Sequence, residues 1–249
     1  MYNPLDQFKI ILLWRCCWNE STKLFLTNIE VYFVLVGFFI FLFFYLSNSN
    51  NSIINWNSYI IVVKELYFFV LNIFRSQVFN KDALKYFPLF FITFIFILFS
   101  NLLGLLPFGF TITSHIIQTF ALAFSLFLGI FIIGFINFKL GFLNFFVPKG
   151  VPTFLIPFLI VIEIISYFIR PFSLSIRLFA NMLAGHTLMY IISSFCLYLL
   201  KEKFFFLIFF VPVFFVFLIF FLELAIAFIQ SYVFLILLCI YLNDSYNLH

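Results

Sequence analysis

The sequence contains few charged residues. Of its 249 residues only 9% are Asp, Glu, Lys or Arg, whereas 66% are hydrophobic. A typical soluble domain carries about 25% charged residues. A chain with so few charges does not have enough polar surface to cover an apolar core in water. The composition therefore excludes a soluble globular domain and predicts a protein that folds in a lipid bilayer.

Dense basic runs and metal-ligand spacings are missing as well. The 13 basic residues are scattered, and a net charge of +4 is too diffuse for a nucleic-acid-binding patch. The four cysteines and three histidines show no spacing that is typical of a metal site. We therefore expect neither a metal nor a nucleic acid as a partner.

Glycine is scarce, with eight residues, whereas phenylalanine occurs 47 times. Abundant Phe, Ile, Leu, Asn and Tyr beside scarce Ala and Gly indicate a coding genome that is rich in A and T. Organellar genomes are often of this kind, so the composition supports an organelle-encoded protein as a hypothesis about localisation.

The apolar runs predict an all-α integral membrane protein, a single membrane domain with about five transmembrane helices. Residues 31–46 form the first span, slightly shorter than the about 20 residues that cross a bilayer. Residues 59–79 include Lys64, Glu65 and Arg75, a mixture typical of an amphipathic helix in the membrane interface. Residues 86–106 and 116–138 form a helical hairpin, because the loop between them is too short for anything else.

The last two segments, 153–200 and 204–242, are each about twice as long as a bilayer crossing. Each is either a tight helical hairpin or one long, steeply tilted helix. Residues 204–242 contain no Gly, and their only Pro, Pro212, lies near the start. Because no turn-forming residues surround Glu223, we expect two long, steeply tilted, antiparallel helices that pack side by side.

Ionisable residues interrupt these apolar segments at Glu163, Arg170, Arg177 and Glu223. A charge at the middle of the bilayer costs about 2.5–3.5 kcal/mol on insertion scales, so such a residue indicates function, an ion pair or a position near the interface. Arg177 and Glu223 are flanked by long, largely apolar stretches, and we interpret both as functional. Arg170 is followed by Pro171, which favours a structural or interfacial role.

The helical spacing of the polar residues groups them on faces. At 100° per residue, Arg177 and Asn181 lie on one face, and His186 lies on roughly the opposite face. Small residues beside Asn181 would allow a neighbouring helix to approach closely. Glu223 and Gln230 share a stripe of the last segment. The pattern indicates a channel or transporter with two polar paths that lead to a central arginine.

Several motifs, in order along nearly the whole chain, resemble subunit a of F-type ATP synthases. The most specific are residues 173–186 (SLSIRLFANMLAGH) and residues 222–234 (LELAIAFIQSYVF). Residues 100–107 (SNLLGLLP), 113–115 (TSH), 4–8 (PLDQF) and 244–249 (DSYNLH) also match.

The resemblance implies a proton-translocating stator subunit with two offset aqueous half-channels. Arg177 matches the arginine that faces the carboxylates of the rotating c-ring and prevents a proton short circuit. Glu223 and His186 match groups of the half-channel that opens to the intermembrane or periplasmic side. Glu163 and Asp244 match acidic groups near the half-channel that opens to the matrix or cytoplasm.

Other polar residues receive lesser roles by the same resemblance. Asn181 and Gln230 match polar neighbours of the arginine. Ser173, Tyr232 and His249 are additional candidates for the proton pathway. The implied subunit is a proton channel without a cofactor or a catalytic site of its own.

The implied partners are the c-ring, other Fo stator and peripheral-stalk subunits, lipid and a second ATP synthase in a dimer. His186 together with Glu223 is a mitochondrial pattern, because many bacterial members carry glutamate at the histidine position. We therefore expect the mitochondrial inner membrane, with a bacterial plasma membrane as the alternative.

Two other classes of membrane protein are alternatives on the residues alone. A secondary transporter would contain inverted repeats with broken helices at matched positions, and the sequence has no such symmetry. A proton-pumping subunit of a respiratory complex would carry Lys and Glu over several spans, whereas here they concentrate in the last two segments.

Overall fold

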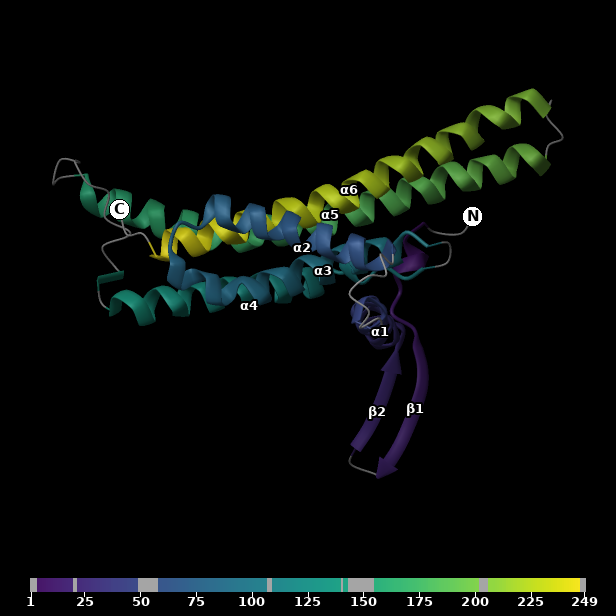
Figure 1. Ribbon diagram of the computed structural model, residues 1–249. Helices are drawn as coiled ribbons and strands as arrows, with labels where there is room; N and C mark the ends of the chain where they lie inside the picture. The colour runs from purple at the N-terminus through teal and green to yellow at the C-terminus, as the bar shows by residue number, and fades with distance from the viewer. Residues whose placement is uncertain are drawn as a thin grey trace. The chain divides into compact units, whose positions relative to one another are not determined.

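The computed structural model describes residues 4–19, 22–48, 58–106, 109–139, 141–142, 155–201 and 206–246. In these ranges the chain forms six α-helices: α1 (Asn28–Asn48), α2 (Ser58–Gln77), α3 (Phe87–Gly104), α4 (Ile116–Phe138), α5 (Ile156–Lys201) and α6 (Phe206–Tyr246) (Figure 1). Short 3-10 helices are η1 (Pro4–Phe8), η2 (Lys81–Tyr86) and η3 (Ile112–Ser114).

The predicted helical membrane architecture is confirmed. Among the described residues, five helices are long and apolar enough to cross a membrane: α1, α3 together with η2, α4, α5 and α6. The remaining helix, α2, is the segment whose mixed composition predicts an interfacial position. The protein is therefore a multi-pass membrane protein.

A small antiparallel sheet precedes α1, and the all-helical prediction did not include it. Strand β1 (Leu12–Asn19) pairs with β2 (Thr22–Thr27). Asn28 joins this ribbon to α1, because its Oδ1 accepts hydrogen bonds from the Ile11 and Ile29 backbone N–H groups at 3.2 and 3.1 Å. Glu30 accepts from the Thr27 N–H at 3.1 Å, as a carboxylate does in a capping box.

The chain divides into two compact units. Unit 1 comprises Met1–Ser49, Ile95–His115 and Leu178–Ser231. Unit 2 comprises Asn50–Phe94, Ile116–Arg177 and Tyr232–His249. Helices α3, α5 and α6 each contribute one part to each unit.

Unit 1 is built from aromatic contacts and from one cluster that joins three helices. Phe33 of α1 stacks on Phe96 of α3, with ring centroids 5.8 Å apart. The buried residues Leu105, Met182 and Ala227 form a cluster that brings the end of α3 against α5 and α6.

Unit 2 is held together mainly by aromatic rings. Phe74 of α2 packs edge-on against Phe90 of α3 at 5.3 Å between ring centroids. Phe127 of α4 lies 4.9 Å from Tyr167 of α5, and both side chains are buried in one cluster. Such offset and edge-to-face pairs add to the free energy of packing beyond their buried area, which gives the many phenylalanines of this unit a structural role.

Helices α5 and α6 are each continuous, so the alternative of two tight hairpins does not hold. Helix α5 has 46 residues and α6 has 41, which correspond to about 69 and 62 Å at 1.5 Å per residue. Pro171 and Pro212 lie inside them without ending them.

The two long helices are antiparallel in unit 1 (Figure 1). Asn181 contacts Gln230, whereas Gly185, one turn later on α5, contacts Glu223, two turns earlier on α6. The steep tilt stays a prediction. The predicted segments 153–200 and 204–242 begin at positions that lie outside the described residues.

Continuity of α6 can be tested with spin labels at Phe214 and Ile229, two exposed positions of unit 1. A continuous helix places their backbones about 22 Å apart. A hairpin folded near Glu223 would bring them to about 10 Å, the spacing of packed helices. Double electron–electron resonance measures this distance. A label pair at Phe214 and Leu218, one turn apart, is the control for short distances.

Candidate functional site

A hydrogen bond between two amide side chains links α5 and α6 in unit 1. Asn181 donates from Nδ2 to Oε1 of Gln230 at 3.0 Å. Gln230 is only 3% exposed, and Asn181 is half-buried. In an apolar surrounding an amide without a partner is costly, so this pair favours one register of the two helices.

Glu223 is the buried carboxyl group of unit 1, with an exposed fraction of 4%. It packs directly on Gly185: a Cβ at position 185 would lie 2.6 Å from its Oε1. Neither carboxyl oxygen has a hydrogen-bond partner among the described residues. A buried carboxyl group of this kind requires either a bound proton or a solvent donor, and both allow it to exchange protons.

His186 follows Gly185 on α5 and is half-buried. Its ring meets the edge of Phe8 of η1, with centroids 6.4 Å apart. Its Nε2 is buried and has no hydrogen-bond partner within the described part of the chain. The structure therefore brings Glu223 against the residue that precedes His186, and a direct hydrogen bond between the two is not among its contacts.

Arg177 lies on an exposed face of α5 in unit 2. The preceding residue, Ile176, is apolar and exposed, and so is Phe172, about 140° away around the helix. Ser173 lies one turn before the arginine and is exposed too, as is Tyr232 of α6. A guanidinium without a partner is costly inside a bilayer, so its exposure on an apolar helix face marks Arg177 as a candidate functional residue.

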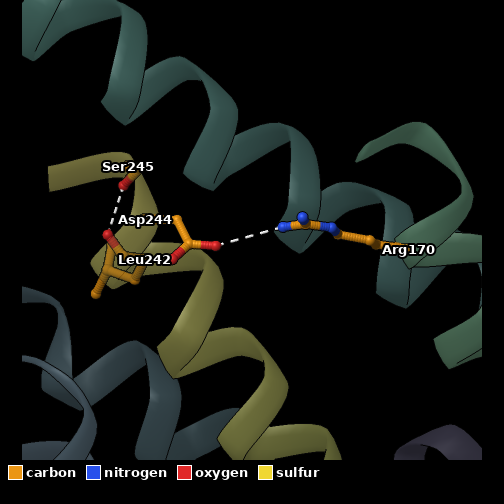
Figure 2. Close-up of polar contacts among 4 residues, drawn as sticks. All are labelled: Arg170, Leu242, Asp244 and Ser245. Atoms are coloured by element: carbon orange, nitrogen blue, oxygen red, sulfur yellow. Dashed lines mark hydrogen bonds and ion pairs between the residues drawn. The ribbon is translucent and has the colours of Figure 1, made fainter. Parts of the chain in front are cut away.

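Arg170 forms an ion pair with Asp244 between α5 and α6 in unit 2. Its Nη1 lies 3.3 Å from Oδ2 of Asp244, and the side chains of both are 25% exposed (Figure 2). The guanidinium also lies 5.4 Å from the ring centroids of Tyr167 and of Tyr241, within the range of cation–π attraction.

The remaining predicted residues are less closely connected. Glu163 is half-buried on α5, two helical turns before Arg170. His249 lies outside the described residues. The structure thus groups Asn181, Gln230, Glu223 and Gly185 in unit 1, and Asp244 with Arg170 in unit 2.

Asn101 of α3 is a buried polar residue to which the sequence analysis assigned no role. It is 0% exposed, and neither Oδ1 nor Nδ2 has a hydrogen-bond partner among the described residues. It lies one turn before Leu105, which packs on Met182 and Ala227, so Asn101 shares the face that meets α5 and α6. The sequence feature that could have identified Asn101 is its position in the motif at residues 100–107.

His115 ends the short connection between α3 and α4. Its ring stacks on Phe110 with centroids 5.1 Å apart. Burial lowers the pKa of the His115 imidazole below its ordinary value, because a charged ring loses its hydration there.

A comparison with protein families identifies the chain. The model of the family described as "ATP synthase A chain" matches residues 30–243. The chain belongs to this family, the proton-translocating subunit a of the Fo sector of ATP synthase. The resemblance seen in the sequence motifs is thereby confirmed, and the family match favours neither a secondary transporter nor a respiratory-complex subunit.

Its relatives are similar over almost their full length. ATP synthase subunit a of Acanthamoeba castellanii is 52% identical, with 99% of this chain and 98% of the relative covered. The subunit of Brassica napus is 43% identical, with 99% and 97% covered. The subunit of Pelagibacter ubique is 41% identical, with 99% and 98% covered.

The contact between Gly185 and Glu223 gives a testable prediction. Gly185→Ala would place a methyl group 2.6 Å from Oε1 and 2.9 Å from Cδ of Glu223, so the carboxyl group must move. Displacement of a proton-transferring group by about 1 Å lowers rates by up to about a hundredfold. We expect a loss of proton flux of about tenfold or more in membrane vesicles that contain the assembled synthase.

Gly129→Ala is the matched control, because nothing lies within 4 Å of a Cβ at that position of α4. Wild-type flux in Gly185→Ala would show that the position of Glu223 is not important for transport.

Proposed function

We propose that the chain loads and unloads the carboxyl groups of a rotating c-ring through two offset half-channels, which Arg177 keeps apart. The observation that carries the proposal is a guanidinium on an exposed, apolar face of a membrane-spanning helix. A partner that brings carboxylates to this face would satisfy the charge, and lipid would not.

Arginine is suited to this position because its guanidinium does not lose its proton at accessible pH and so cannot relay one. It also stabilises the ionised form of a ring carboxyl group. At about 4 Å and an effective dielectric constant near 20, the attraction is about 4 kcal/mol, or about 3 pKa units of the ring carboxyl. That is enough to release a proton from a carboxyl group whose pKa burial has raised.

The two half-channels use residues from different units. Glu223 and His186, with the pair Asn181 and Gln230 nearby, belong to unit 1 and would form the half-channel of the intermembrane side. Glu163 and Asp244 belong to unit 2 and would form the half-channel of the matrix side. A membrane potential adds about 2.3 kcal/mol per proton and 100 mV to the driving force.

The c-ring would pack on the exposed faces of α5 and α6. In unit 1 these faces carry the small, exposed residues Ala180, Ala184 and Ala225, which allow a neighbouring helix to approach closely. Other partners would be the remaining Fo stator subunits, the peripheral stalk and a second synthase in a dimer.

Location in the mitochondrial inner membrane, with an organellar gene, is part of the proposal. It is supported by relatives from an amoeba, plants and a fungus and by the phenylalanine-rich composition. The similarity to the Pelagibacter subunit keeps a bacterial plasma membrane as the alternative.

Arg177 provides the decisive test. We expect Arg177→Gln and Arg177→Ala to abolish ATP-driven proton pumping in reconstituted vesicles, while the complex still assembles. Arg177→Lys should also lose most of the activity, because a buried lysine can release its proton. Normal pumping by Arg177→Gln would overturn the proposal. Ile176→Ala, which truncates the exposed apolar side chain next to Arg177, controls for damage to the interface.

A second test concerns Glu223 and His186, which we expect to act as one relay through direct or water-bridged hydrogen bonds. Glu223→Gln should lower proton flux by about a hundredfold, the lower range for a positioned proton-transfer group. ATP hydrolysis should stay coupled to pumping, because Arg177 is intact.

The exchanged pair, His186→Glu with Glu223→His, keeps both titratable groups and should retain more flux than either single exchange. A double exchange no better than the singles would contradict the relay.

A further inference from the structure

Three charged residues follow one stripe of α5 in unit 2. Glu163, Arg170 and Arg177 are spaced at seven residues, so their side chains leave nearly the same face of the helix. Successive members are about 10 Å apart along the axis. A proton that leaves the ring at Arg177 and passes Glu163 must therefore cross about 20 Å, far more than one hydrogen bond can bridge.

Asp244 of α6 contacts Arg170, the middle residue of this stripe. Figure 2 shows its carboxylate directed at the guanidinium of Arg170, and Oδ2 of Asp244 lies 3.3 Å from Nη1. The two tyrosine rings lie on the same guanidinium, one from each helix: Tyr167 of α5 and Tyr241 of α6. Arg170, which lies against both tyrosine rings, thus holds the carboxylate midway along the stripe.

The charged and titratable groups around the pair come from both helices. Tyr167 interacts electrostatically with Arg170, Asp244 and Tyr241. Tyr241 interacts with the same two charges and also with Arg177. Among the described residues, Asp244 therefore has the cation Arg170 and the phenols Tyr167 and Tyr241 near it, and Arg177 acts on Tyr241.

We infer that Arg170 is a positioning residue of the matrix-side half-channel, which holds Asp244 as a stationary anion so that Asp244 guides protons without carrying them. This inference rests on the proposed function and adds the role of Arg170 to it. A carboxylate fixed at mid-path can accept hydrogen bonds from protonated water between Arg177 and Glu163, while Arg170 balances its charge.

The stability of the ion pair between Arg170 and Asp244 is the reason why Asp244 would not carry protons. Arg170 stabilises the charged carboxylate of Asp244. Arg177 would stabilise the ionised form of a ring carboxyl group by the same electrostatic attraction. A proton that bound to Asp244 would break this ion pair and leave the guanidinium of Arg170 without its partner. Glu163, which has no recorded ion pair among the described residues, is better suited to carry protons.

The test uses the complete ATP synthase in vesicles, with proton flux driven by an imposed membrane potential and measured against matrix-side pH. In Arg170→Gln the carboxylate of Asp244 loses its cation and becomes open to protonation. We expect the acidic limb of the flux profile to move to higher pH by about 1 unit or more. Lys9→Gln, which removes the exposed pair with Asp6, is the matched control and should leave the profile unchanged.

Two further variants separate a stationary anion from a carrier. Asp244→Asn leaves Arg170 as an uncompensated cation in the path and should lower flux by about tenfold or more. Arg170→Gln with Asp244→Asn removes both charges and should recover part of that loss, because the repulsion by the uncompensated cation is gone while the guiding anion is still missing. A carrier role for Asp244 predicts no recovery in the double variant.

Either of two results would overturn the inference: flux in the double variant as low as in Asp244→Asn, or an unshifted acidic limb in Arg170→Gln. A pair that only fastens the two helices together would give the second result. If Arg177→Gln blocks pumping while one of these results is found, this inference fails alone. If Arg177→Gln pumps normally, the proposed function itself fails.

Discussion

The cost of a polar group in an apolar bilayer is the constraint on which the arrangement of α5 and α6 depends. A charge or amide that water cannot reach must find its partner on a facing helix. Between α5 and α6, Asn181 meets this requirement with Gln230 in unit 1, and Arg170 meets it with Asp244 in unit 2. Both are contacts between the same two helices, so the polar residues favour one register for this long antiparallel pair.

Residues that remain without such a partner are the ones to which transport can be assigned. The carboxyl oxygens of Glu223 and Nε2 of His186 are buried and lack protein partners among the described residues, and Arg177 is exposed on an apolar face. Structural stability alone would not favour these positions. Exchange of protons with water and with a moving carboxylate would give each of them a function, which is the physical basis of the proposed half-channels.

Much of this could be read from the sequence, because charges inside apolar runs are visible without a structure. Arg177 and Glu223 stand out for that reason, and the absence of Gly around Glu223 predicted a continuous α6. The partner of Arg170 could not be predicted, since Asp244 is 74 positions away and hydropathy does not fix the register of two helices. The β1–β2 ribbon was missed because a two-stranded hairpin is marginal alone and leaves a weak pattern.

The division of the chain has a consequence for the mechanism. The groups assigned to the intermembrane side, Glu223 and His186, belong to unit 1, and those assigned to the matrix side, Glu163 and Asp244, belong to unit 2. In the proposed mechanism, two half-channels that must not connect would be served by residues with separate packing cores. A substitution in one core would then disturb one path more than the other. Arg177 would act on both, because in this mechanism every proton that passes between the paths is carried past it on the ring.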